Sequence, residues 1–80
     1  MDDFTSKIQD GTSDFDVTFH KIRIPNGWKF YITLMKDAEI SASFDMTRNG
    51  ENWKLVPPVP NWLIEKETEL SDLIRYHIPL

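Results

Sequence analysis

The middle of the chain alternates between apolar and polar residues, which is the pattern of half-buried β-strands. Apolar residues stand at every second position from Trp28 to Leu34 and again from Ile40 to Met46. Successive side chains of a strand point to opposite faces of a sheet, so this period of two predicts one apolar face and one solvated face. A similar run from Phe15 to Phe19 precedes these segments, and Trp53 and Leu55 follow them. The pattern predicts four antiparallel strands joined as a meander.

An Asn-Gly dipeptide at Asn49-Gly50 predicts a hairpin, because both residues tolerate the positive φ of a two-residue type I′ turn. A turn at these two residues sets the register of the neighbouring strands. Apolar residues then face apolar ones, and opposite charges face each other. The expected pairs are Met46 with Trp53, Phe44 with Leu55, Arg48 with Glu51, and Asp45 with Lys54.

The segment Pro25-Asn26-Gly27 predicts a second hairpin, with a three-residue loop and Gly27 at positive φ. This loop pairs Ile24 with Trp28 and keeps their apolar faces matched. Phe15 to Phe19 are out of phase with Ile24, however, and one extra residue would correct the phase. We therefore expect a β-bulge near His20-Lys21.

The C-terminal part of the chain predicts a helix that covers the apolar face of the sheet. The Pro-rich segment 57–60 is expected to be an extended connector, because proline lacks an N–H donor and has a fixed φ. Apolar residues then recur at helical spacing within 61–77, and an interruption near Thr68 leaves open whether this segment is one helix or two short ones. The expected fold is a single small α+β domain over residues 1–80, with order ββββα.

Residues 1–14 fit two interpretations. Phe4 and Ile8 are four residues apart, and Gly11 follows them, which predicts a short helix. The same segment is rich in Asp, so a flexible acidic arm is the alternative.

Composition excludes several classes of protein. The chain of 80 residues has no cysteine, which rules out disulfides and thiolate metal sites. No apolar run approaches the roughly 18 residues of a membrane span, and the acidic N-terminus differs from a signal peptide. We expect a soluble, cytoplasmic protein with no membrane partner.

No motif predicts catalysis, a cofactor or a metal. His20 and His77 are far apart in the sequence and have no partner at ligand spacing. Of the three glycines, Gly27 and Gly50 are assigned to turns, which leaves no Gly-rich phosphate loop. The sequence predicts a protein that is not an enzyme.

Charge distribution predicts a binding protein. The formal net charge is −4, and residues 1–16 and 61–80 hold nine of the thirteen carboxylates. Acidic surfaces attract basic partners. We therefore expect a small accessory protein that binds a basic protein, such as an inhibitor, immunity or anti-defence protein of a bacterium or its phage. The candidate contact residues are Asp2, Asp3, Asp10, Asp14, Asp16, Glu65 and Glu69.

The basic middle of the chain supports an alternative. A positive sheet face with an aromatic residue is suited to single-stranded nucleic acid. This interpretation requires that the candidate residues share the solvent face of the sheet: Lys21, Arg23, Lys29, Tyr31 and Lys54. Self-association through an edge strand is a third hypothesis.

Overall fold

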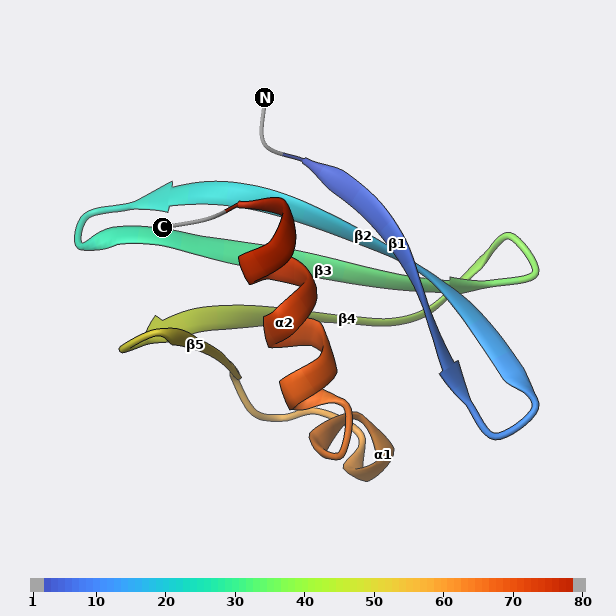
Figure 1. Cartoon of the computed structure of the whole chain (residues 1–80). Helices are drawn as coiled ribbons and strands as arrows, with labels where there is room; N and C mark the ends of the chain where they lie inside the picture. Colours follow the sequence, from blue (N-terminus) through green and yellow to red (C-terminus); the bar gives the residue numbers. More distant parts are fainter. Residues whose placement is uncertain (1–2, 79–80) are drawn as a thin grey trace.

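Five antiparallel strands form one curled sheet, and two helices lie on one face of this sheet (Figure 1). The structure is a computed structural model that describes residues 3–78. The strands are hydrogen-bonded in the order of the sequence. The α+β class is confirmed, but the expected four strands are one too few. The elements are β1 (Phe4–Asp10), β2 (Ser13–Ile24), β3 (Gly27–Lys36), β4 (Glu39–Asn49), β5 (Asn52–Leu55), α1 (Asn61–Ile64) and α2 (Glu67–His77).

The additional strand is β1, so the N-terminal segment is neither a helix nor a flexible arm over its described residues. It pairs with β2 along its whole length, with Phe4 opposite Phe19 and Ile8 opposite Phe15. A spacing of four residues fits a strand as well as a helix, because four is also a multiple of two. Pairing with β2 buries Ile8, and this tertiary contact favours the strand.

The β2–β3 hairpin has a shorter turn than expected. Ile24 pairs with Gly27, so the turn contains two residues rather than three, and Gly27 has the expected positive φ, at 133°. The ladder is regular from Asp16 to Ile24, and the β-bulge predicted near His20-Lys21 is absent. Ile22 instead lies on the outer face, where 37% of its surface is exposed. An unbroken ladder keeps the backbone donors and acceptors of β2 paired, at the cost of one half-exposed isoleucine.

The register predicted for the β4–β5 hairpin is wrong by two residues. Met46 pairs with Leu55 and Arg48 with Trp53, around a turn at Gly50-Glu51. Gly50 has a φ of 67°, and Glu51 does not have a positive φ. A type I′ turn needs a positive φ at both central residues and a type II′ turn only at the first, so this turn is of type II′. A shift of two residues keeps every side chain on its expected face, so Trp53 is still buried.

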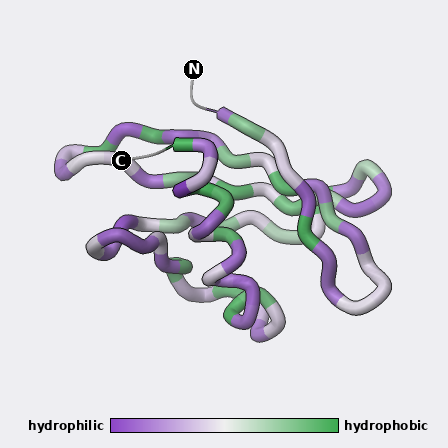
Figure 2. The backbone as a smooth tube through the Cα atoms, viewed as in Figure 1, coloured by the Kyte–Doolittle hydropathy of each residue, from purple (hydrophilic) through white to green (hydrophobic). Residues whose placement is uncertain are grey.

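The helices cover the inner face of the sheet and complete its core (Figures 1 and 2). The helical segment is divided in two, as one interpretation allowed, but the division lies at Glu65-Lys66 rather than near Thr68. The segment 57–60 is outside any helix or strand, and it bends at Pro57-Pro58, where the peptide bond is cis, rather than running extended. Hydrophobic residues from both layers form a single cluster that includes Val17, Phe19, Phe30, Ile32, Leu34, Met46, Leu63, Leu70 and Ile74.

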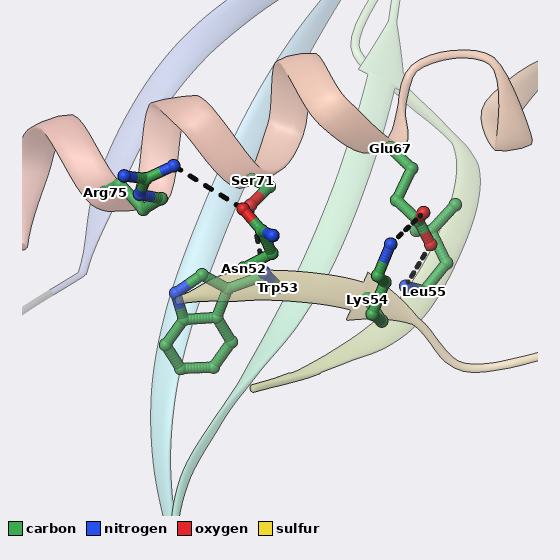
Figure 3. Close-up of polar contacts among 7 residues, drawn as sticks. All are labelled: Asn52, Trp53, Lys54, Leu55, Glu67, Ser71 and Arg75. Carbon is green, nitrogen blue, oxygen red and sulfur yellow. Dashed lines mark hydrogen bonds and ion pairs between the residues drawn. The ribbon is translucent and has the colours of Figure 1, made fainter. Parts of the chain in front are cut away.

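Two side chains of α2 bind the free edge of β5 (Figure 3). The backbone N–H of Trp53 donates to Ser71 Oγ at 2.9 Å, and that of Leu55 donates to Glu67 Oε2 at 2.9 Å. Alternate N–H groups of a strand are about 6.6–6.8 Å apart, and residues four apart in a helix rise by about 6 Å. The two spacings are similar, so α2 satisfies consecutive outward-facing donors of this edge strand. We call this pair of contacts the edge tether.

The left-handed backbone of Gly27 leads to a stability prediction. Gly27→Ala should lower the free energy of unfolding by roughly 1 kcal/mol or more, because a β-carbon is strained at this φ. The measurement is chemical denaturation, with Asn26→Ala in the same turn as control. Equal midpoints for the two variants would show that Gly27 does not need its observed backbone angle.

The edge tether leads to a second stability prediction. Ser71→Ala should cost about 1–3 kcal/mol, because it leaves the buried N–H of Trp53 without an acceptor. Ser43→Ala, at an exposed position on β4, is the matched control and should change stability by less than about 0.5 kcal/mol. Urea denaturation measures both, and a Ser71→Ala variant as stable as the control would contradict the role of this hydrogen bond.

Candidate functional site

The acidic residues expected to form one contact surface lie at three separate places. Asp3 is at the start of β1, and Glu65 and Glu69 belong to the helical layer. Asp2 lies outside the described residues. The remaining three carboxylates are near the β1–β2 turn: Asp10, Asp14 and Asp16.

Asp3 joins the beginning of β1 to β2. Its Oδ2 accepts a hydrogen bond from His20 Nδ1 at 3.1 Å, and its Oδ1 accepts one from the backbone N–H of Lys21 at 3.1 Å. The hydrogen bond from His20, followed by that from Lys21, lowers the pKa of the Asp3 carboxyl below its usual value. Asp3 therefore has a structural partner and is not a spare charge on a mobile arm.

Three exposed carboxylates border one side of the helical layer, and we call them the acidic stripe: Glu65, which lies in the break before α2, and Glu69 and Asp72 of α2. Glu69, Asp72 and Tyr76 are spaced i, i+3, i+7 within α2, which places them on one side of that helix. Tyr76 is 80% exposed. The stripe borders a shallow depression of about 560 Å³, which is lined by Glu65, Thr68, Glu69, Asp72, Leu73 and Tyr76.

The basic residues of the nucleic-acid hypothesis do not share one face. Lys21 pairs with the fully buried Phe30, which places Lys21 on the inner side of the sheet, at the end of the sheet near the β2–β3 turn. Arg23 is two residues further along the same strand and lies on the same side. Alternation places the remaining residues of this set on the outer face, and they are Lys29, Tyr31 and Lys54.

Two of the outer cations are paired with carboxylates. Lys29 Nζ lies 3.2 Å from Asp45 Oδ2, and Lys54 Nζ lies 3.3 Å from Glu67 Oε1. The outer face therefore has fewer available positive charges than the sequence suggests.

The two histidines contact the N-terminal strand segment. His20 binds Asp3, and the ring of His77 stacks on Phe4 with 4.2 Å between centroids. Within residues 3–78, no three His, Asp or Glu side chains group in a way that would hold a metal ion. The two helices within residues 3–78, α1 and α2, are not long and apolar enough to cross a membrane.

Comparison with known proteins does not assign this chain to a family. No family model matches it, and neither the curated proteins nor the solved structures include a significant match.

Sequence reasoning omitted several residues that the fold brings into these surfaces. Asp72 and Tyr76 complete the stripe, and their helical spacing from Glu69 was a usable signal. Arg48 and Trp28 lie beside Lys21 and Arg23 on the inner face. The sequence had predicted Lys21 and Arg23 on the outer face, because a bulge was expected in β2.

The bonds of Asp3 predict a specific pH dependence. A carboxyl whose pKa is lowered by folding contributes stability above its unfolded pKa and loses that contribution as the pH falls through its folded pKa. Wild type should therefore be more stable than Asp3→Asn at neutral pH, and the difference should decrease below about pH 4. Thermal unfolding midpoints of both proteins across this range provide the measurement.

His20→Phe supplies the control, because it removes the hydrogen bond that contributes most to the lowered pKa of Asp3. In this background the difference between Asp and Asn at position 3 should be smaller. A difference that is independent of pH in the wild-type background would contradict the assignment.

Proposed function

We propose that this protein is a non-enzymatic binding protein that contacts a basic protein partner through the acidic stripe and Tyr76. The observation that supports this proposal is the exposure of Tyr76 at the end of a line of carboxylates. The opposite side of α2 buries Leu70 and Ile74 in the core, so folding already explains the apolar side of this helix. Folding does not explain a tyrosine that is 80% exposed.

Tyrosine is suited to a contact surface for physical reasons. Its ring provides a large apolar area with few rotatable bonds, and its hydroxyl group forms a hydrogen bond when the ring is covered. Glu69 and Asp72 form long ion pairs of 3.9 Å with Lys66 and Arg75, so the stripe would steer a basic partner toward the helix with less than its full formal charge. The combination supplies both an anchor and a charge that selects the partner.

The class of accessory protein follows from this chemistry. A small protein with an acidic helix face can occupy a basic surface of a larger target and block it. We therefore retain the proposal of an inhibitor, immunity or anti-defence protein of a bacterium or its phage, acting in the cytoplasm. The carboxylates near the β1–β2 turn, Asp10, Asp14 and Asp16, are a secondary charge on another part of the surface.

The two alternatives have less support. Nucleic-acid binding on the outer face is weakened because Lys29 and Lys54 are paired with carboxylates and Lys21 lies on the other side. Self-association through β5 is opposed by the edge tether, which occupies its outward donors. The other edge strand, β1, carries Lys7 with an 81% exposed side chain, and a charged lysine disfavours edge pairing.

The test is affinity capture from a lysate of the native host, with and without nuclease. The bait proteins are wild type, an acidic-stripe variant (Glu65→Gln, Glu69→Gln, Asp72→Asn) and a matched cation variant (Lys21→Gln, Arg23→Gln, Lys29→Gln). Wild type and the cation variant should retain one protein partner after nuclease treatment, and the stripe variant should lose it. Capture that disappears with nuclease, or that the stripe variant retains, would refute the proposal.

A captured partner allows a quantitative prediction for Tyr76. Tyr76→Ala should weaken binding by about 30-fold, the effect of a hot-spot residue worth roughly 2 kcal/mol. The acidic-stripe variant should mainly slow association, and the effect should decrease as salt is added. Surface plasmon resonance at two salt concentrations separates the two contributions, and an unchanged affinity for Tyr76→Ala would exclude Tyr76 as the anchor.

A further inference from the structure

A pocket of about 230 Å³ opens at the end of the sheet where the β2–β3 and β4–β5 turns lie. It lies near the C-terminal end of α2, because Ile78 is part of its wall. We call it the tryptophan pocket. Its lining residues are Lys21, Ile24, Asn26, Gly27, Trp28, Phe30, Thr47, Arg48, Trp53 and Ile78.

The first unusual feature of this pocket is Trp28. The next residue on the same face of β3, Phe30, is fully buried, whereas Trp28 is 43% exposed. Two cations lie against its ring, with Lys21 Nζ 4.3 Å and Arg23 Cζ 5.9 Å from the ring centroid. These cation–π contacts hold the indole ring in place while a large part of its surface is open to solvent.

The charge of the pocket is opposite to that of the whole protein. Lys21 and Arg48 are lining residues, and Arg23 lies beside Trp28. Of the lining residues within 3–78, none is Asp or Glu, although the chain has a net charge of −4. Three cations at the mouth of a partly apolar site favour an anionic ligand.

The second unusual feature is the side chain of Trp53. Its indole Nε1–H is buried and has no hydrogen-bond acceptor among the described residues, although its backbone N–H is bound by Ser71. Figure 3 shows the indole ring projecting from β5, with its nitrogen at the end of the ring toward Arg75 in this view. Buried donors without a partner are rare in folded proteins and cost free energy. The ring of Trp53 forms part of the pocket wall, although its Nε1 atom is too buried for a ligand to reach.

We propose that the tryptophan pocket binds a nucleotide, either free or as part of a single strand. The base would stack on Trp28, which is 43% exposed, and the phosphate would lie among the three cations. Asn26 provides a side-chain amide that can pair with the edge of a base. The volume is below the roughly 300–1,000 Å³ of pockets for drug-sized ligands, so it suits one ring system.

This site is independent of the proposed protein-binding surface. The acidic stripe lies on the exposed side of α2, and no residue of its depression lines the tryptophan pocket. Either proposal can fail without affecting the other.

The test is titration of the ¹⁵N-labelled full-length protein, followed by ¹H–¹⁵N correlation spectra. The probes are AMP, a short oligothymidylate, adenosine and inorganic phosphate. AMP or the oligonucleotide should give saturable shifts of the Trp53 indole signal and of the backbone amides of Lys21, Trp28 and Arg48. Tighter binding of the oligonucleotide, with strong salt dependence, would identify a single strand as the source of the base.

Variants separate stacking from charge. Trp28→Ala should weaken AMP binding by about tenfold or more, because stacking on an aromatic side chain is lost. Arg48→Gln should weaken binding of AMP but not of adenosine, which has no phosphate. Lys7→Gln, an exposed cation on β1, is the control and should bind AMP like wild type. The backbone spectrum of each variant shows whether it is folded.

Several results would overturn the proposal. One is the absence of saturable shifts at about 1 mM AMP or oligonucleotide, a range in which weak specific sites still bind. Others are shifts centred on Lys29, Tyr31 and Lys54 of the outer face, or AMP binding by Trp28→Ala as tight as that of wild type.

Discussion

The edge tether between α2 and β5 is the interaction on which the rest of the structure depends. The chain leaves the sheet through a Pro-rich connector that offers few backbone donors, so the helical layer needs another attachment to the sheet. Ser71 and Glu67 provide it by accepting consecutive outward N–H groups of β5. The same two contacts close an edge that would otherwise be open to another strand. Burial of Leu70 and Ile74 against the sheet adds the apolar part of this attachment.

The position of α2 also determines the two candidate surfaces. Because one side of the helix faces the sheet, Glu65, Glu69 and Asp72 face solvent with Tyr76. Because α2 ends at His77, the inner face near the β2–β3 turn is not covered by the helix, and Trp28 remains partly exposed. One helix placement thus produces an acidic outer stripe and a cationic pocket at its far end. This separation of charge is consistent with two different ligands.

Parts of this arrangement follow from local sequence pattern. Alternation in β3 and β4 predicted the buried residues in the middle of these strands, because a strand must place alternate side chains on one face, but Trp28 and Ile40 near the strand ends are exposed. The positive φ of Gly27 was predicted correctly, although the three-residue loop from which it was inferred is a two-residue turn and Gly27 begins β3. The β4–β5 register was not accessible in the same way, because registers two residues apart give the same buried face. A preference for Gly50 at the first corner of the turn decided between them.

The sequence by itself determined the strand periodicity, the connector at 57–60, the helical tendency of 61–77 and the total charge. Each depends on residues that are close in the chain. Tertiary structure alone decided that Phe4–Asp10 is a strand, because a spacing of four residues fits both periods until β2 is present as a partner. It also decided which charges lie together. Lys21 and Lys29 are on opposite faces because the β2 ladder has no bulge, and a single inserted residue would have reversed that arrangement.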